Sequence, residues 1–241
     1  MSSTTARPEG GAVRIVTGKA RVTQTDGTQG RTLFPSPEFS HWPPFETLVE
    51  SSMVGSGAPD PHSHEREEVA NYVISGTLLV YDEDRRCTEL PAGSVSLLST
   101  VRRQSHDVNP QPGTTAHWIA LVFRLPRGTA EPKLSYQSAP ANSLAGLPPG
   151  VEGSSIVGEP GPVRSVLGLE MRAIHFREPH ETEVPIGADR TAVVYVLDGV
   201  IRATSRELPA GSGLLVDGLS HLSVRGERGS RLMYASVLRG S

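Results

Sequence analysis

The stretch "HSHEREEVANYVISG", residues 62–76, joins two histidines one residue apart to a charged turn and an apolar run that ends at Gly76. On a β-strand, His62 and His64 point to the same face, about 7 Å apart along the chain, which suits two imidazoles that converge on one metal. In a polar loop the same spacing carries little information. The rest of the chain has to decide between a metal site and a polar turn.

Strand-like runs dominate the remaining sequence. Short runs rich in Val, Leu and Ile end at Gly, Pro, Asp or Ser, as in "VANYVISGTLLVYD" (69–82), "HWIALVFRL" (117–125) and "TAVVYVLDGVIRATS" (191–205). The 241 residues include 25 glycines and 20 prolines spread along the chain, which indicates many turns. Few stretches show a helical period. The sequence therefore predicts an all-β protein built from barrels or sandwiches.

Two short motifs occur twice, in the same order. "YVISG" at 72–76 is followed by "LPAGS" at 90–94, and "YVLDG" at 195–199 is followed by "LPAGS" at 208–212. Either match alone means little, because such sequences are common in β-turns. Together, at similar separations, they indicate an internal duplication and predict one small barrel in each half.

A Pro-, Gly-, Ser- and Ala-rich segment between residues 126 and 162 separates the two halves. Such composition is typical of a surface connection. We expect an N-terminal barrel with the metal site in 1–137, a linker in 138–162, and a C-terminal degenerate barrel without metal in 163–241.

The formal net charge is −3 and the isoelectric point is about 6.2, which gives no support for electrostatic binding to nucleic acid. The single cysteine, Cys87, excludes an intrachain disulfide and fits a reducing compartment. The start, "MSSTTARPEGG", lacks the order of a signal peptide, and no apolar run reaches the roughly 18 residues of a membrane helix. We expect a cytoplasmic monomer or small homo-oligomer without membrane contact.

Two further residues extend the histidine pair. His106 follows a strand-like run that begins at Gly93 and can return to the same barrel interior. Glu68, four residues after His64, is the next acid in suitable register. Three neutral imidazoles with a carboxylate and open positions suit iron(II), manganese or nickel better than structural zinc.

The region 55–137 resembles the cupins, and more closely the pirin-like bicupins. Their first motif is H-x-H, three residues, Glu, seven residues, Gly, which matches residues 62–76. "GAPDPH" (57–62) is similar to the lead-in of that motif. In the second motif a histidine follows a glycine by thirteen residues, as His106 follows Gly93. The resemblance is looser over the N-terminal strands and the second half.

This resemblance implies two tandem cupin, jelly-roll-like β-barrels and one divalent metal. Iron(II) is common in the family, and manganese, nickel, copper and zinc are the alternatives. The family's histidine ligands correspond to His62, His64 and His106. A quercetinase-like dioxygenase that acts on an aromatic or enolic small molecule is the implied activity.

The family's fourth ligand, a glutamate two residues after the third histidine, is replaced by Val108. Asp107 is adjacent but points to the opposite face of a strand. Glu68 stands where ordinary cupins place their carboxylate ligand, so the fourth ligand is Glu68, water or nothing, and we expect Glu68 to act as a ligand, as the catalytic base, or as both. We interpret Glu65, Arg66 and Glu67 as a solvated turn.

The second half lacks the matching ligands. At the repeat offsets, the three histidine positions fall on Pro185, Gly187 and Val224. This predicts a metal-free second barrel.

Three functions remain open on the sequence. The first is a mononuclear oxygenase, in which Arg102 and Arg103 are either surface charges or contacts for an anionic substrate at the barrel mouth. The second is a non-catalytic metal- or redox-sensing regulator that binds a transcription factor or an enzyme, which the loss of glutamate at Val108 favours. The third is a bicupin that binds a small molecule without metal.

Overall fold

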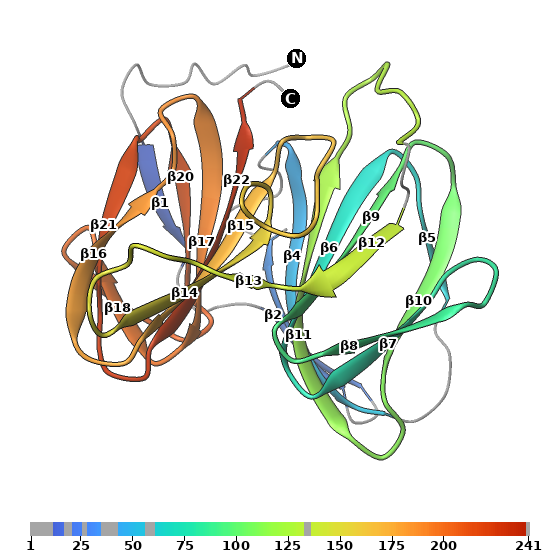
Figure 1. Cartoon of the computed structure of the whole chain (residues 1–241), viewed down its shortest axis with the longest axis horizontal. Helices are drawn as coiled ribbons and strands as arrows, with labels where there is room; N and C mark the ends of the chain where they lie inside the picture. The colour runs from blue at the N-terminus through green and yellow to red at the C-terminus, as the bar shows by residue number, and fades with distance from the viewer. Residues whose placement is uncertain are drawn as a thin grey trace.

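The computed structural model describes residues 12–16, 21–25, 28–34, 43–55, 61–132 and 136–239. In these ranges the chain forms antiparallel strands arranged in four sheets, a seven-stranded and a four-stranded sheet for each half (Figure 1). The predicted all-β class and two-barrel architecture are confirmed. Within the described ranges, no helix has the length and apolar character needed to cross a membrane.

The first half pairs a small sheet with a large one. The small sheet has the order β5 (His62–His64), β10 (Gln104–Pro110), β7 (Thr77–Tyr81) and β8 (Cys87–Pro91). The large sheet has the order β12 (Tyr136–Pro140), β9 (Ser94–Thr100), β6 (Glu67–Ser75), β11 (Thr115–Arg124), β4 (Phe45–Val54), β3 (Thr28–Phe34) and β2 (Arg21–Thr25).

The second half repeats this plan. Its small sheet has the order β16 (His180–Pro185), β21 (His221–Gly226), β18 (Val200–Ala203) and β19 (Arg206–Pro209). Its large sheet has the order β1 (Ala12–Val16), β20 (Gly213–Asp217), β17 (Arg190–Asp198), β22 (Arg231–Leu238), β15 (Glu170–Phe176), β14 (Val151–Val157) and β13 (Asn142–Ser143).

The repeated motifs occupy equivalent places in the two halves. Gly76 and Gly199 end the equivalent strands β6 and β17 with positive φ angles of 77° and 69°. A Cβ on Gly76 would lie 2.2 Å from the backbone oxygen of Thr115, and a Cβ on Gly199 would lie 2.5 Å from the hydroxyl of Ser230. Both positions therefore require glycine for the backbone angle and for the close approach of the neighbouring strand.

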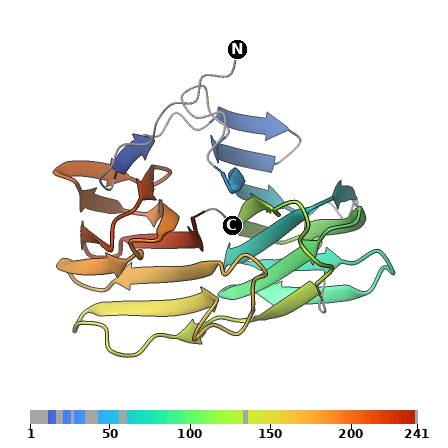
Figure 2. The same cartoon turned by 90° about the horizontal axis from the view of Figure 1, so that it is seen from above.

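Each large sheet ends on a strand that lies outside the expected domain boundaries. β1, from the start of the chain, pairs with β20 of the second half, where Figure 2 shows it beside the orange and red strands. β12, which follows the first repeat, pairs with β9 and closes the first half's sheet. The first repeat begins with β1, and the second repeat can be counted from β12. The first strand of each repeat then belongs to the large sheet of the other half.

The expected linker, 138–162, is also corrected. β12 extends to Pro140, and β13 and β14 already belong to the second half's large sheet, so little more than Ala141 joins the sheets. The Gly-, Ser- and Pro-rich composition that indicated a loop is tolerated because β12 and β13 are edge strands.

Three apolar clusters stabilise the architecture. One fills the first barrel and another fills the second. The third cluster combines residues of both large sheets and thus lies between the two halves. It includes Leu48, Ala70, Leu97, Ile119, Leu121 and Phe123 from the first half and Leu167, Met171, Val193, Leu215, Met233 and Val237 from the second. The apolar strands of the second half therefore bury one face against the first half.

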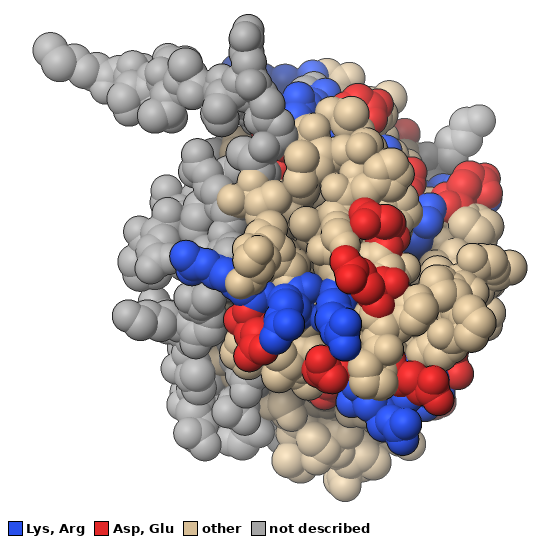
Figure 3. Space-filling model, turned by 90° about the vertical axis from the view of Figure 1, so that its left-hand side faces the viewer, with Lys and Arg blue, Asp and Glu red and all other residues tan. Residues whose placement is uncertain are grey.

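The outer face of the second barrel carries both positively and negatively charged side chains. Figure 3 shows blue and red side chains next to one another on the side that faces the viewer. Exposed pairs include Arg202 with Glu207 at 2.5 Å and Arg225 with Glu227 at 4.0 Å. This face does not form the single-sign basic field that electrostatic binding to nucleic acid uses.

Replacement of Gly76 and Gly93 by alanine separates backbone strain from steric clash. Both glycines have positive φ angles, 77° and 81°, but no atom lies within 4 Å of a Cβ built on Gly93. Gly93→Ala should lower the free energy of unfolding by about 1–2 kcal/mol, the usual strain of this conformation. Gly76→Ala should lower it by about 1–3 kcal/mol more, since Thr115 has to move. Equal losses in urea denaturation would contradict the close approach.

Candidate metal centre

His62, His64 and His106 come from two paired strands of the first barrel's small sheet. In the register of β5 and β10, His106 lies opposite His62, and Gln104 lies opposite His64. Directly opposed residues share a face of a sheet, as do residues two apart along a strand. The local strand geometry therefore places all three imidazoles on one face, as the sequence predicted.

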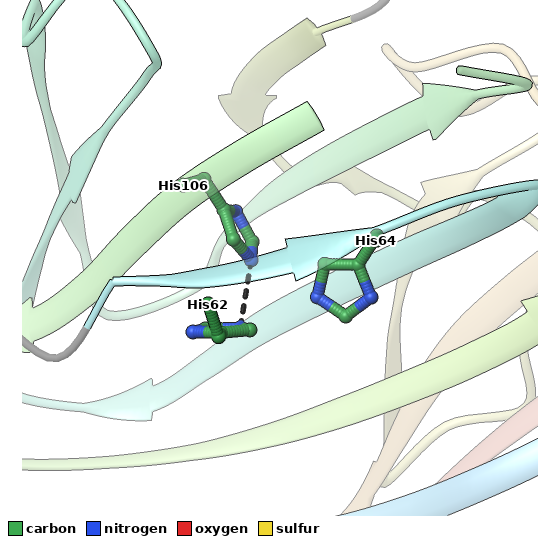
Figure 4. A group of neighbouring side chains, drawn as sticks. All are labelled: His62, His64 and His106. Atoms are coloured by element: carbon green, nitrogen blue, oxygen red, sulfur yellow. Dashed lines mark hydrogen bonds between the residues drawn. The ribbon is translucent and has the colours of Figure 1, made fainter. Parts of the chain in front are cut away.

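The three rings converge. Their centroids lie 5.0 Å (His62–His64), 4.5 Å (His62–His106) and 5.0 Å (His64–His106) apart, and one ring nitrogen from each lies within 4.8 Å of the others. The Nε2 atoms of His62 and His106 are 2.9 Å apart (Figure 4). Among the described residues, this is the only such group of histidine, cysteine and acidic side chains.

The protonation pattern suits metal binding. The Nδ1 atom of His64 lies 2.7 Å from a carboxyl oxygen of Glu67, while its buried Nε2 atom has no hydrogen-bond partner. A proton on Nδ1 leaves the Nε2 lone pair directed at the shared centre. Burial, followed by the charges of His62 and His64, lowers the pKa of His106 to about 3, which keeps this imidazole neutral. Three converging imidazoles, one with a buried nitrogen that lacks a hydrogen-bond partner, fit a divalent transition metal.

Comparison with known proteins addresses the fold. No protein-family model and no curated protein sequence matches the chain. Among solved structures, the protein GK1651 of Geobacillus kaustophilus superposes with a TM-score of 0.81 at 19% identity, over 96% of this chain and 98% of that chain. The Escherichia coli bacterial pirin YhhW, in complex with nickel(II), superposes with a TM-score of 0.78 at 13% identity, over 94% and 99%.

A third structure, a quercetin 2,3-dioxygenase of Acinetobacter baumannii, superposes with a TM-score of 0.80 at 20% identity, over 94% of this chain and 79% of that chain. The chain has the two-barrel fold of the pirin-like bicupins. The resemblance that the motifs indicated is thus confirmed for the fold.

Within this bicupin fold, Glu68 does not lie with the histidines, and its expected role as ligand or base is corrected. Its side chain is fully buried against the second half, where it accepts hydrogen bonds from four donors. They are the hydroxyl of Ser99 at 2.7 Å, the hydroxyl of Ser165 at 2.5 Å, and the backbone N–H groups of Val166 at 2.7 Å and Leu167 at 3.3 Å. Glu68 therefore joins the halves.

The carboxyl group beside the histidines belongs to Glu67, which the sequence analysis placed in a solvated turn. β6 begins at Glu67, so Glu67 and Glu68 point to opposite faces of the strand. Glu67 contacts His64 on one side and the guanidinium of Arg124, at 3.1 Å, on the other. Its position three residues after His64 was the signal that could have identified it.

Val108 and Asp107 lie as the sequence indicated. Val108 pairs with Val80 in the ladder and packs against the apolar cluster inside the first barrel. Asp107 is buried and accepts a hydrogen bond from Asn109 at 2.5 Å, with Arg85 at 3.9 Å. Neither position supplies a carboxylate to the histidines.

A polar hollow of about 280 Å³ in the first half is lined by residues of both charges, including Glu83 and Glu131. Arg102, Arg103 and Gln104 are among its lining residues, and Gln104 is the ladder partner of His64. The ion pair of Arg102 with Glu131, 3.5 Å long, is exposed and weak. The two arginines are exposed and share this hollow with Gln104, the one lining residue that pairs with a histidine strand.

The second half's histidines do not form a comparable group within the described ranges. His180 and His221 lie at opposite ends of the pairing between β16 and β21, and His175 lies on β15. In the first half, His117 contacts Glu50 at 2.6 Å, and Glu50 also accepts a hydrogen bond from Tyr195 of the second half. His117 thus has a structural role at the contact between the halves.

Glu67→Gln should weaken metal binding, because an amide is a poorer acceptor for the Nδ1–H group of His64. We expect the affinity for a divalent metal to fall about ten-fold or more. Competition with a chromogenic chelator measures the effect. The exposed neighbour Glu65 provides the matched control, and Glu65→Gln should leave the affinity unchanged. Equal affinities for both variants would contradict a role for Glu67.

Glu68→Gln should act on stability instead. The substitution places an amide N–H₂ among four donors, so the free energy of unfolding should fall by about 2–4 kcal/mol. Metal stoichiometry should stay that of the parent. Urea denaturation and elemental analysis of one preparation measure both quantities, and a loss of metal without a loss of stability would restore Glu68 to the metal centre.

Proposed function

We propose that this protein binds one divalent metal, iron(II), through His62, His64 and His106 and oxygenates an aromatic or enolic small molecule. The observation that carries the proposal is the convergence of three imidazoles, with the buried Nε2 atom of His64 lacking a hydrogen-bond partner. A bound metal would act as a Lewis acid toward an enol or catechol oxygen of the substrate.

The donor set leaves room for substrate. The three histidines would bring no negative charge to a bound ion, and within the described residues the group contains no carboxylate. Coordination positions then remain for an anionic oxygen of the substrate and for dioxygen. Glu67 keeps His64 in one orientation, which is the usual task of a carboxylate behind a metal-bound histidine.

The hollow beside Gln104 holds Arg102 and Arg103 together with Glu83 and Glu131, and the two arginines are its candidate contacts for an anionic substrate. Glu68 is fully buried elsewhere, so a proton-transfer role for it loses its basis. Arg102 and Arg103 beside Gln104 favour the ionised form of an enol that approaches the centre. In this proposal the arginines lower the pKa of the incoming hydroxyl, and the apolar side chains inside the barrel contact the ring.

A second candidate function is a metal- or redox-sensing regulator that binds a protein partner without turnover. Val108 in place of a glutamate ligand favours it, because the converging group contains no carboxylate within the described residues. The two functions share the metal and differ in catalysis.

The test loads metal-free protein with iron(II) under nitrogen and measures bound metal and oxygen consumption with the flavonol quercetin. The parent should bind about one metal and consume oxygen. His62→Ala combined with His64→Ala should lose both properties and keep the fold by circular dichroism. Metal binding without oxygen consumption would favour the regulator.

The matched control replaces His175, His180 and His221 by glutamine. These residues lie outside the converging group, so metal stoichiometry should not change. Full metal content in the His62/His64 variant, or a loss in the control, would contradict the proposed centre.

A further inference from the structure

A second pocket, of about 430 Å³, lies at the seam between the two halves, lined by residues other than the three histidines. Tyr72 of the first half contributes to its wall, and strands β14, β15 and β22 of the second half contribute most of the rest. Its volume is in the range of sites for small organic ligands.

Glycine at position 153 shapes one side of this pocket. A Cβ there would lie 2.6 Å from Leu147 and 3.1 Å from Leu144. The two leucines, in the segment that precedes β14, therefore pack on the face of this strand that carries Ile174 of β15. On the opposite face, which carries His175, the side chains of Leu197 and Ala173 give the pocket an apolar surface.

A row of four polar residues crosses the large sheet of the second half at this place. In the ladder, Glu152 lies opposite His175, His175 opposite Arg231, and Arg231 opposite Asp198. Directly opposed residues share a face, so the row extends over four neighbouring strands. Three of its members, Glu152, His175 and Arg231, line the pocket.

Glu152 and Asp198, the two ends of the row, each form an ion pair with an arginine, and Arg231 keeps donors for a further ligand. Glu152 is bound by Arg177 at 2.8 Å, and this hydrogen bond lowers the pKa of Glu152. The Nε atom of Arg231 donates to Asp198 at 2.5 Å, which uses one of the five donors of a guanidinium. The terminal amino groups of Arg231 can therefore form a bidentate pair with a further carboxylate.

The neighbouring groups are neutral hydrogen-bonding partners. Burial raises the pKa of Tyr72, so its hydroxyl stays protonated and can donate. Burial, followed by the charges of Arg177 and Arg231, lowers the pKa of His175, so its ring is neutral at pH 7. An anion in the pocket then meets Arg231 and two neutral side chains, and the negative charge of the nearby Glu152 is balanced by its ion pair with Arg177.

We propose that this pocket binds a small aromatic carboxylic acid, with its carboxylate on Arg231 and Tyr72 and its ring against Leu197 and Ala173. The site is separate from the proposed metal centre and does not depend on it. Residues of both halves form it, so occupancy stabilises their contact.

The test titrates 2-naphthoate into the full chain by isothermal calorimetry. We expect saturable binding to one site per chain. Arg231→Gln should weaken it about ten-fold or more, because a bidentate charge-assisted pair is lost. Tyr72→Phe, which removes one hydroxyl, should weaken it about three-fold or more. The uncharged analogue 2-naphthylmethanol should bind more weakly than the acid by a similar factor to that of Arg231→Gln.

Two controls define the site. Arg202→Gln removes an arginine from an exposed ion pair on the far face of the second barrel and should leave binding unchanged. His62→Ala with His64→Ala should also leave it unchanged, which separates this site from the metal centre. If Arg231→Gln fails to fold, as its melting temperature would show, Tyr72→Phe decides. Absence of saturable binding, undiminished binding in Tyr72→Phe, or loss in the His62/His64 variant would overturn the proposal.

Discussion

Each of the two large sheets in this protein has an apolar side chain layer on both of its faces, and both layers are buried. One face packs inside its own barrel, and the other packs against the large sheet of the opposite half, in a cluster that draws on both halves. Removal of either half would expose this layer to water, at a cost that grows with the apolar area exposed. The exchanged edge strands β1 and β12 follow from the same contact, since each crosses it to complete the other half's sheet.

Two buried carboxyl groups fix how the two large sheets are aligned across this apolar layer. Glu68 accepts hydrogen bonds from Ser165, Val166 and Leu167, and Glu50 accepts one from Tyr195, all of the second half. A buried carboxyl group without partners is strongly unfavourable, so the halves are held where these donors meet it. Apolar packing supplies the attraction, and the polar contacts select one alignment.

The duplicated barrels have diverged in their chemistry while they keep the same strand order. The small sheet of the first half holds three converging imidazoles, whereas the equivalent positions of the second half are Pro185, Gly187 and Val224. The second half instead presents the polar row through His175 and Arg231 on its large sheet, at the seam with the first half. Each half thus has its distinctive polar side chains on a different sheet.

The sequence by itself determined the all-β class, the duplication, and the grouping of His62, His64 and His106, because these depend on strand alternation and on turn glycines such as Gly76. It did not determine which of Glu67 and Glu68 meets the histidines. Alternation states that neighbouring residues point to opposite faces, and only the packing of the second half decides what each face meets. The exchange of β1 and β12 was likewise settled by pairing between segments far apart in the chain, which no local pattern records.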